Sequence, residues 1–207
     1  MVKEKVRLRY AGLIMFMSRL FSAATGVIFT IMVTRSTSTG EFGVWSNLFD
    51  VLTYFTLMAT IIPFWTTRFT AREYEGSAKT GFITNVLMST VFAFFFIALI
   101  PTIMSALNIP SNYTILYTIA SIQILELYTL SALEAVLYAK QPHMIGYGSL
   151  IFEICKVAIG FAFIIQLKLG LVGAISSIII SYTLQLAFYF KLLANELKGV
   201  IRWTYLK

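Results

Sequence analysis

The stretch that decides the fold is residues 81–107, GFITNVLMSTVFAFFFIALIPTIMSAL, a run without a single charged side chain. As a helix it would be about 40 Å long at 1.5 Å per residue, which exceeds the roughly 30 Å hydrocarbon core of a bilayer. Comparable apolar runs recur five more times in the 207 residues. The chain is therefore predicted to cross a membrane six times, through spans at residues 11–33, 42–67, 81–107, 112–139, 144–166 and 171–190.

The composition is that of a membrane protein rather than of a soluble domain. Hydrophobic residues make up 58% of the chain and charged residues 12%, whereas soluble domains carry about 25% charged residues. The spans and their short loops leave no room for a soluble catalytic domain, and the sequence has neither a phosphate-binding glycine loop nor a cluster of cysteines and histidines. We therefore expect an all-α, polytopic membrane protein with one six-helix transmembrane domain over residues 1–207, without cofactor, metal site or enzymatic activity.

The distribution of basic residues predicts the orientation, because Lys and Arg accumulate in cytoplasmic loops. With the N-terminus inside, twelve basic residues lie in cytoplasmic segments and two, Arg35 and Lys168, in outer loops. Both termini are therefore expected in the cytoplasm, and the protein in the cell membrane. The net charge of +7 gathers at span ends rather than along one exposed face, so no nucleic-acid partner is expected. The twelve are Lys3, Lys5, Arg7, Arg9, Arg68, Arg72, Lys79, Lys140, Lys191, Lys198, Arg202 and Lys207.

Local signals also predict where the second span begins and where it is disturbed. Ser38 and Glu41 have the spacing of a capping box, which starts a helix. Pro63 lies near the end of the same span and has no N–H to donate, so a neighbouring group must satisfy the carbonyl that it frees.

Six ionisable side chains lie inside the expected spans. A charge in hydrocarbon costs several kcal/mol, so such a residue pairs with another, reaches the interface or lines a water-filled cavity. Three spans also present polar residues on one helical face, as expected for a cavity lining. The six are Arg19, Asp50, Glu126, Glu134, Glu153 and Lys156. The three faces combine Arg19 with Ser22, Gly26 and Thr30; Asn47 with Asp50 and Tyr54; and Gln123 with Glu126 and Glu134.

Four of these charges have structural explanations that compete with a functional one. Glu153 and Lys156 are three residues apart on one helix and can neutralise each other. Arg19 can extend its long stem toward the cytoplasmic interface. Glu134 lies six residues before Lys140, near that same interface.

Asp50 and Glu126 are harder to explain as packing residues. Asp50 has a short side chain about 10 Å from the outer end of its span, and Glu126 lies near the middle of its span with no opposite charge one turn away. A carboxylate that holds or releases a proton in a cavity suits cation or proton coupling, whereas Arg19 and Lys156 suit an anionic group such as a phosphate. The sequence therefore predicts transport of a polar or charged solute, with Asp50 and Glu126 as its strongest site residues.

The junction of the first two spans, TRSTSTGEFGVW at residues 34–45, resembles the polysaccharide-transporter branch of the multidrug/oligosaccharidyl-lipid/polysaccharide exporter superfamily. The shared element is an Arg, a short Ser/Thr segment and an acidic-aromatic-Gly triplet that opens the second helix. The resemblance implies a flippase that moves lipid-linked oligosaccharides by alternating access between two six-helix lobes. It also implies that Arg19 meets the lipid pyrophosphate, with Asp50 and Glu126 in coupling or sugar contacts.

The chain departs from that family in length and in charge. Family members are about twice as long. This chain would then be a first lobe that pairs with a second copy of itself or with a complementary lobe, or else the first lobe of a split, truncated or remnant transporter. Their cavities are often basic, whereas the spans here carry four carboxylates and two cations. Two alternatives stay open: a lobe of a multidrug or cation-coupled exporter, and a non-transporting scaffold subunit of a glycan-assembly or secretion complex.

Overall fold

The computed structural model describes residues 8–206, and within them the chain is helical with no strand. Six of its helical segments are long and apolar enough to cross a membrane, which confirms the predicted fold class. The basic residues Lys3, Lys5 and Arg7, and Lys207 at the other end, lie outside the described residues. The six segments are Tyr10–Ser36, Thr39–Ala71, Ser77–Ala106, Ser111–Lys140, His143–Gln166 and Gly170–Leu193.

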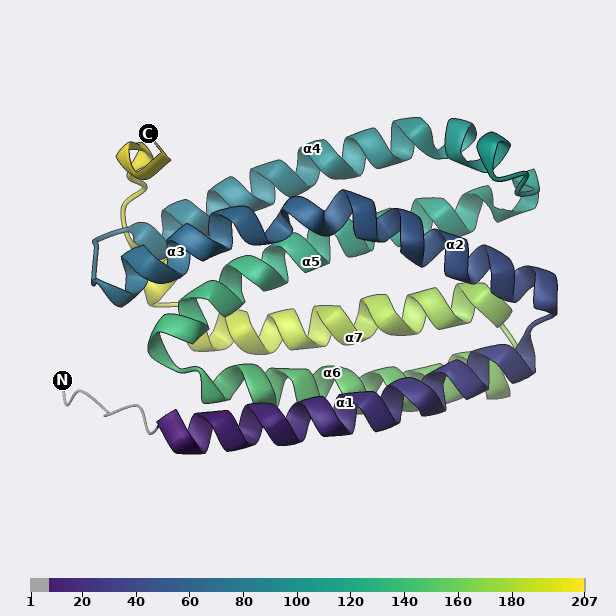
Figure 1. Ribbon diagram of the computed structural model, residues 1–207, viewed down its shortest axis with the longest axis horizontal. Helices are drawn as coiled ribbons and strands as arrows, with labels where there is room; N and C mark the ends of the chain where they lie inside the picture. The colour runs from purple at the N-terminus through teal and green to yellow at the C-terminus, as the bar shows by residue number, and fades with distance from the viewer. Residues whose placement is uncertain (1–7, 207) are drawn as a thin grey trace.

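The long segments are built from seven α-helices and several short helical turns (Figure 1). The second span is interrupted, and the fifth ends in a π-helical turn. In chain order the elements are α1 Leu8–Ser36, α2 Thr39–Thr56, η1 Leu57–Thr60, α3 Ile61–Ala71, α4 Ser77–Ala106, η2 Ser111–Tyr113, α5 Thr114–Lys140, α6 His143–Gly160, η3 Phe161–Gln166, α7 Gly170–Leu193, η4 Glu196–Lys198 and η5 Trp203–Leu206.

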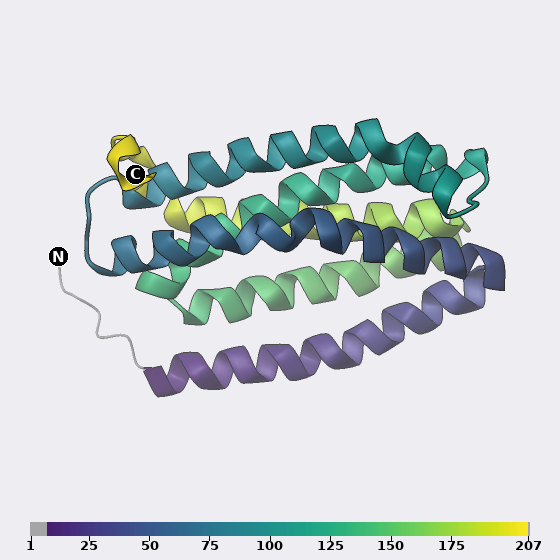
Figure 2. The same ribbon diagram turned by 45° about the horizontal axis from the view of Figure 1, so that its top comes forward.

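α5 and α7 form the centre of the bundle. In the spans that contain α5 and α7, 56% and 50% of the residues of the most apolar stretch are buried, whereas the share is at most 28% in the other four spans. α1 and α6 lie beside each other on one side of this pair, and α2, α3 and α4 lie on the other (Figure 1). α1 and α2 meet at their short connection and diverge away from it, so the two halves of the bundle spread apart toward the N-terminal end of α1 (Figure 2).

The second span begins as its sequence predicts. The backbone N–H of Ser38 donates to a carboxylate oxygen of Glu41 at 2.7 Å, and the backbone N–H of Glu41 donates to the Ser38 hydroxyl at 3.3 Å. This reciprocal pair is the expected capping box, and it satisfies backbone N–H groups that have no partner at the start of α2.

The interruption between α2 and α3 is also explained by its sequence. Pro63 is the third residue of α3 and cannot donate to the carbonyl of Ala59, four residues earlier. The buried Asn85 of α4 takes this role, because its amide donates to the Ala59 carbonyl at 3.2 Å and to the Tyr128 carbonyl at 2.6 Å. The Tyr128 hydroxyl donates to the Phe55 carbonyl at 3.1 Å. The expected partner for the freed carbonyl is therefore present, and it ties the break to α4 and α5.

Candidate functional site

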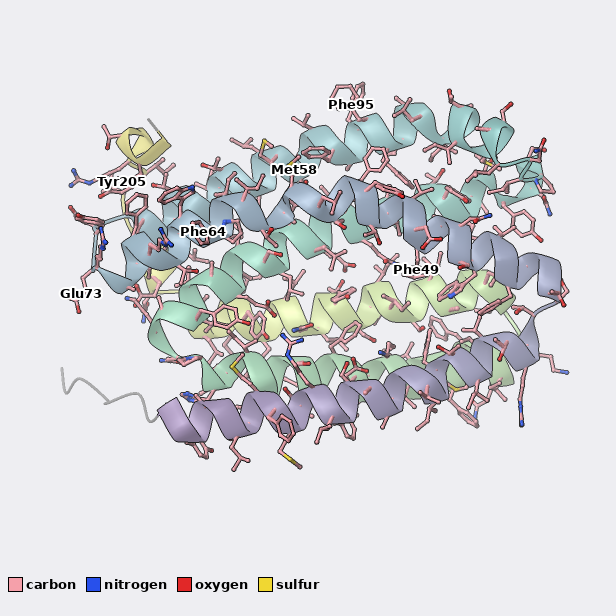
Figure 3. The ribbon with its side chains drawn as sticks, in the orientation of Figure 1. Phe49, Met58, Phe64, Glu73, Phe95 and Tyr205 are labelled. Carbon is pink, nitrogen blue, oxygen red and sulfur yellow. The ribbon has the colours of Figure 1, made fainter. Side chains whose placement is uncertain are left out.

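Two cavities with polar groups in their walls follow one another along α1. The first, of about 230 Å³, lies between α1, α5, α6 and α7, beside residues 15–22 of α1. The second, of about 350 Å³, lies beside residues 26–30 of α1 and has α2 as an additional wall, with Phe49 on that side (Figure 3). The first is lined by Met15, Ser18, Arg19, Ser22, Leu130, Glu134, Tyr138, Ile145, Gly146, Ser149, Phe152, Glu153, Tyr182 and Gln185. The second is lined by Gly26, Phe29, Thr30, Trp45, Phe49, Leu52, Thr53, Thr56, Gln123, Leu127, Phe152, Lys156, Ile178 and Tyr182.

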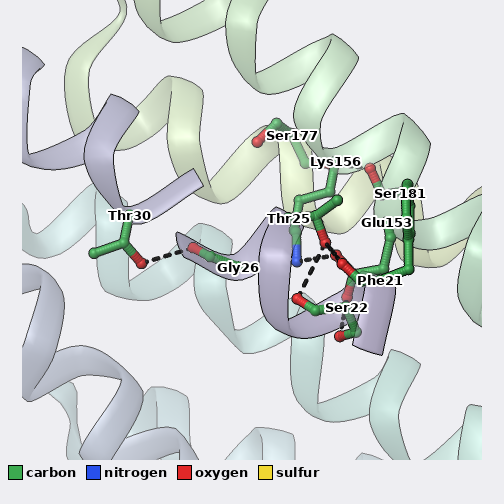
Figure 4. A network of polar contacts seen from close by, with 9 residues as sticks. All are labelled: Phe21, Ser22, Thr25, Gly26, Thr30, Glu153, Lys156, Ser177 and Ser181. Carbon is green, nitrogen blue, oxygen red and sulfur yellow. Dashed lines mark hydrogen bonds and ion pairs between the residues drawn. The ribbon is translucent and has the colours of Figure 1, made fainter. Parts of the chain in front are cut away.

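Glu153 is the most completely bonded charge of the site (Figure 4). One of its oxygens accepts from the Ser22 hydroxyl at 2.6 Å, and the other accepts from the Thr25 hydroxyl. The Lys156 ammonium lies 2.6 Å from that second oxygen, and both charged residues are buried. The expected neutralisation of Glu153 by Lys156 is therefore formed, and α1 contributes two further donors to it.

Close packing of α1 on α6 brings these donors to the carboxylate. A Cβ at Gly146 would lie 2.6 Å from the Ile14 side chain, and one at Gly160 would lie 2.7 Å from the Phe29 ring. Both distances are too short for any larger residue without a shift, so the two glycines let the helices approach between them. Ser22 and Thr25 lie on α1 between Ile14 and Phe29, which places their hydroxyls against Glu153.

A stacked aromatic pair separates the two cavities. The rings of Phe152 on α6 and Tyr182 on α7 have centroids 4.2 Å apart and are inclined by 23°. Both residues line both cavities. The Lys156 ammonium lies 4.9 Å from the centre of the Phe152 ring, so the cation stays near this partition on the side of the second cavity.

The first cavity also holds one cation and one carboxylate besides Glu153. Arg19 enters from α1 and Glu134 from α5. Arg19 is exposed in the described lobe, and Glu134 is half-buried. Because Lys156 neutralises Glu153, the cavity is left with Arg19 and Glu134, two opposite charges close enough to attract each other, as the groups that can meet a charged solute.

Gln123 supplies a polar group to the second cavity. It is 2% exposed, and its amide nitrogen has no hydrogen-bond partner among the described residues. A buried donor without a partner is costly, and a water molecule or a polar ligand in the cavity would satisfy it.

The two residues that the sequence favours most, Asp50 and Glu126, lie outside both cavities. Glu126 is buried between α5 and α7, where one oxygen accepts from the Thr183 hydroxyl at 2.9 Å. Its other oxygen has no partner within residues 8–206. Asp50 is exposed on α2, about 200° around the helix from the buried Leu48.

The predicted polar faces are therefore divided in space. Arg19 and Ser22 line the first cavity, and Gly26 and Thr30 the second, as one face of α1 allows. On α5 the face is split, since Gln123 lies at the second cavity, Glu134 at the first and Glu126 against α7. Asn47 and Asp50 of α2 border neither of the two cavities.

Several residues of the site carry no strong signal in the sequence. Thr25 and Thr183 are single hydroxyls in apolar helices, and their role depends on a carboxylate more than 50 residues away. In the sequence, Tyr182 and Phe152 cannot be distinguished from the other aromatic residues of the membrane spans. The role of Asn85 could have been predicted from the sequence, because an amide side chain inside the apolar stretch 81–107 needs hydrogen-bond partners in a membrane. Within the described residues no three His, Cys, Asp or Glu side chains are arranged to hold a metal ion.

No protein-family model matches the chain, and no curated protein sequence matches it. Solved structures do match. An outward-facing multidrug resistance MATE family transporter of the MOP superfamily is 13% identical over 90% of this chain and 44% of its own, with a TM-score of 0.76. A MOP superfamily transporter from Pyrococcus furiosus, described by the reverse polarity of its binding pocket, is 13% identical over 92% and 46%, with a TM-score of 0.72.

A third match is the Vibrio cholerae MATE transporter VcmN in the bent form, 13% identical over 96% of this chain and 49% of its own, with a TM-score of 0.69. This chain thus spans about half the length of the transporters that it resembles. At such low identity the likeness shows the fold alone. The chain has the fold of one lobe of a MATE transporter, and it is a multi-pass membrane protein.

Proposed function

We propose that this chain is one lobe of a two-lobe transporter that moves a charged, amphipathic solute across the cell membrane by alternating access, and that it is not an enzyme. The observation that carries the proposal is a pair of cavities in an apolar bundle whose walls include Arg19, Glu134, Glu153, Gln123 and Lys156. Polar groups at this depth are retained in membrane proteins mainly where they line a path for ions or solutes.

The partition between the cavities fits such a path. The stacked Phe152–Tyr182 pair lines both cavities, and we propose that it is the barrier between them. An alternating-access carrier needs a barrier of this kind, because a continuous polar channel would leak solute. Separation of the two rings by a small rotation of α6 against α7 would move the barrier, and the glycine contacts of α6 with α1 would allow the helix to slide.

We propose a lipid-linked oligosaccharide or polysaccharide precursor as the cargo. Arg19 is exposed and lines the first cavity, so it could bind the pyrophosphate with charge-assisted hydrogen bonds while the lipid tail stays in the bilayer. The junction at residues 34–45, which resembles the polysaccharide branch, supports this choice.

A second cargo class, cationic drugs, is favoured by a different observation. The matched structures include a multidrug resistance transporter, and the first cavity holds Glu134, a carboxylate not neutralised by the Glu153–Lys156 pair. A cation would bind at Glu134 and be repelled by Arg19. A scaffold subunit without transport would use neither group.

The matched transporters are about twice as long, so we propose that a second lobe completes the transporter, and a second copy of this chain is one candidate for it. Both termini are proposed to lie in the cytoplasm, as the twelve basic residues at that end predict.

The test is a flux measurement in proteoliposomes with two cargoes, a fluorescent lipid-linked oligosaccharide and the cation ethidium. A glycan carrier moves the first cargo, slows at least tenfold in Arg19→Ala and tolerates Glu134→Gln. A drug carrier moves ethidium and shows the opposite dependence. Arg35→Ala is the matched control, because Arg35 is an exposed arginine in the last turn of the same helix. Rates equal to those of protein-free vesicles for both cargoes would refute the transport proposal.

A further inference from the structure

A third cavity lies away from the two described above, where α3 ends and α4 begins. It has a volume of about 430 Å³, and its walls include the rings of Trp65, Phe69 and Tyr205. Tyr205 belongs to the C-terminal segment, which folds back over this end of the bundle (Figure 3). Trp65 and Phe69 lie in the last two turns of the second span, which ends at Ala71, so the cavity lies near the level of the membrane–water interface, where aromatic belts occur.

The polar atoms of the cavity wall are already engaged. The Thr66 hydroxyl donates to the Ile62 carbonyl at 2.9 Å. The Thr80 hydroxyl donates to the Gly76 carbonyl at 2.8 Å and accepts from the Arg202 backbone N–H at 2.9 Å. An occupant therefore meets aromatic and aliphatic surface, which fits a hydrocarbon chain.

The C-terminal wall is held by several independent contacts. The Tyr205 hydroxyl donates to the Glu75 carbonyl at 2.9 Å, and the Arg202 guanidinium pairs with the Glu75 carboxylate. The Tyr205 ring is stacked 5.4 Å from that of Phe69. Gly76, with φ +75°, lies so close to the Val200 carbonyl that a Cβ would be 2.0 Å from its oxygen. These contacts hold the C-terminal segment against the α3–α4 connection, so this wall of the cavity is part of the fold.

A cation is positioned beside this apolar cavity. The guanidinium carbon of Arg68 lies 4.1 Å from the centre of the Phe64 ring and 5.5 Å from that of Trp65, which is a wall of the cavity. A guanidinium stacked on rings keeps its N–H edge available for a phosphate. Residues 68–79, 140 and 191–206 carry seven basic side chains against three acidic ones, so this end of the bundle attracts anions.

We propose that this cavity binds one anionic phospholipid, with an acyl chain against the wall formed by Trp65, Phe69 and Tyr205 and the phosphate on Arg68. The predicted orientation places the cavity in the cytoplasmic leaflet. This leaflet is rich in anionic lipids, which are the lipids that the proposed site would bind. The site is separate from the transport path, so the two proposals stand independently.

Trp65 provides a direct readout, because bromine atoms on an acyl chain quench a tryptophan in contact. The chain has three tryptophans, and replacing Trp45 and Trp203 by Phe leaves Trp65 as the single tryptophan of the variant. The full chain is reconstituted in phosphatidylcholine vesicles that contain increasing fractions of dibrominated phosphatidylglycerol or dibrominated phosphatidylcholine. We expect half-maximal quenching at an about fivefold lower fraction of the anionic lipid, the ratio expected for one arginine near the membrane surface.

Arg68→Gln is expected to abolish this preference, Arg68→Lys to retain much of it, and Arg35→Gln, at the opposite end of the bundle, to leave it unchanged. Circular dichroism of each variant checks that it is folded. Equal quenching by the two lipids, or a preference that persists in folded Arg68→Gln, would overturn the proposal. sn-Glycerol 3-phosphate, which has a phosphate but no acyl chain, is expected not to compete; competition by it would assign the site to free phosphate esters.

Discussion

At the scale of single residues, the Glu153 carboxylate is held by two hydroxyls and one ammonium. Removing Lys156 would leave the carboxylate buried without its counter-charge, which is strongly destabilising in proteins, by about 3–5 kcal/mol. We therefore expect Lys156→Ala to lower the midpoint of thermal unfolding in detergent well below that of the native chain. Lys156→Met combined with Glu153→Gln should recover most of the loss, because no buried charge is then unpaired.

Lys191→Ala is the control, since Lys191 is an exposed lysine in the last turn of α7. Its midpoint should match that of the native chain. A Lys156→Ala variant as stable as Lys191→Ala would mean that the ion pair contributes little to the stability of the fold.

The sequence predicts this pair but not its surroundings. A spacing of three residues on one helix is a local property, so the contact between Glu153 and Lys156 can be read directly. Ser22 and Thr25 belong to a helix more than 120 residues away, and their role depends on the rotation of α1 against α6. For the same reason Glu126, which sequence spacing groups with Glu134, faces Thr183 instead of the first cavity.

At the scale of elements, the break between α2 and α3 depends on one amide. Asn85→Leu would leave the Ala59 carbonyl without its donor, at a cost of about 1–3 kcal/mol. Pro63→Ala restores a backbone N–H four residues after Ala59, so it should reduce the cost of Asn85→Leu. A double-mutant cycle measured by thermal unfolding should give a coupling of about 1 kcal/mol.

Ser89→Ala is the matched control for this cycle. Ser89 is buried on the same helix, and its hydroxyl bonds within that helix to the Val86 carbonyl. It should show no coupling with Pro63→Ala. If the losses of stability caused by Asn85→Leu and Pro63→Ala are additive, the contribution of Asn85 to stability does not depend on the break between α2 and α3.

Hydropathy finds each span because it sums local transfer energies, and Pro63 marks the disturbed one. Neither signal shows that the span divides into α2, η1 and α3, because the length of the break depends on which partners the neighbouring helices offer. Asn85 and Tyr128 are such partners. The capping box at Ser38, in contrast, is complete within four residues and is predicted in full.

The Phe152–Tyr182 partition makes a prediction about access from the two sides of the membrane. With Cys155 replaced by Ser, a cysteine at Ser149 reports on the first cavity and one at Thr30 on the second. We expect each to react with a membrane-impermeant thiol reagent from one side, and from opposite sides. Phe152→Ala should make both reactive from both sides, because the ring that divides the cavities is lost.

Phe161→Ala, which removes an exposed ring later in the same span, should leave the sidedness unchanged. If Phe152→Ala also leaves it unchanged, another group forms the barrier. Equal reactivity from both sides in the parent variants would show that the two cavities are already continuous.

At the scale of the whole molecule, one face of α2 is left without a partner in the described lobe. Ser46, Asp50 and Tyr54 are exposed there, and Tyr54 is 72% exposed. The exposed face of α4 has another character, with Phe94, Phe95 and other large apolar residues, and Phe95 points away from the bundle (Figure 3). Polar faces of membrane helices contact protein or water rather than lipid. The face of α2 is therefore expected to meet a second lobe, and that of α4 to meet acyl chains.

A photo-reactive phenylalanine tests this assignment at two exposed aromatic positions. Benzoylphenylalanine in place of Tyr54 should form protein adducts on irradiation of native membranes, whereas the same residue in place of Phe95 should react with lipid. An adduct of twice the mass of the chain identifies a second copy as the other lobe, and a different mass identifies a complementary chain. Lipid adducts alone at both positions would contradict the pairing, because Asp50, one turn from Tyr54, would then lie in hydrocarbon without a partner at a cost of several kcal/mol.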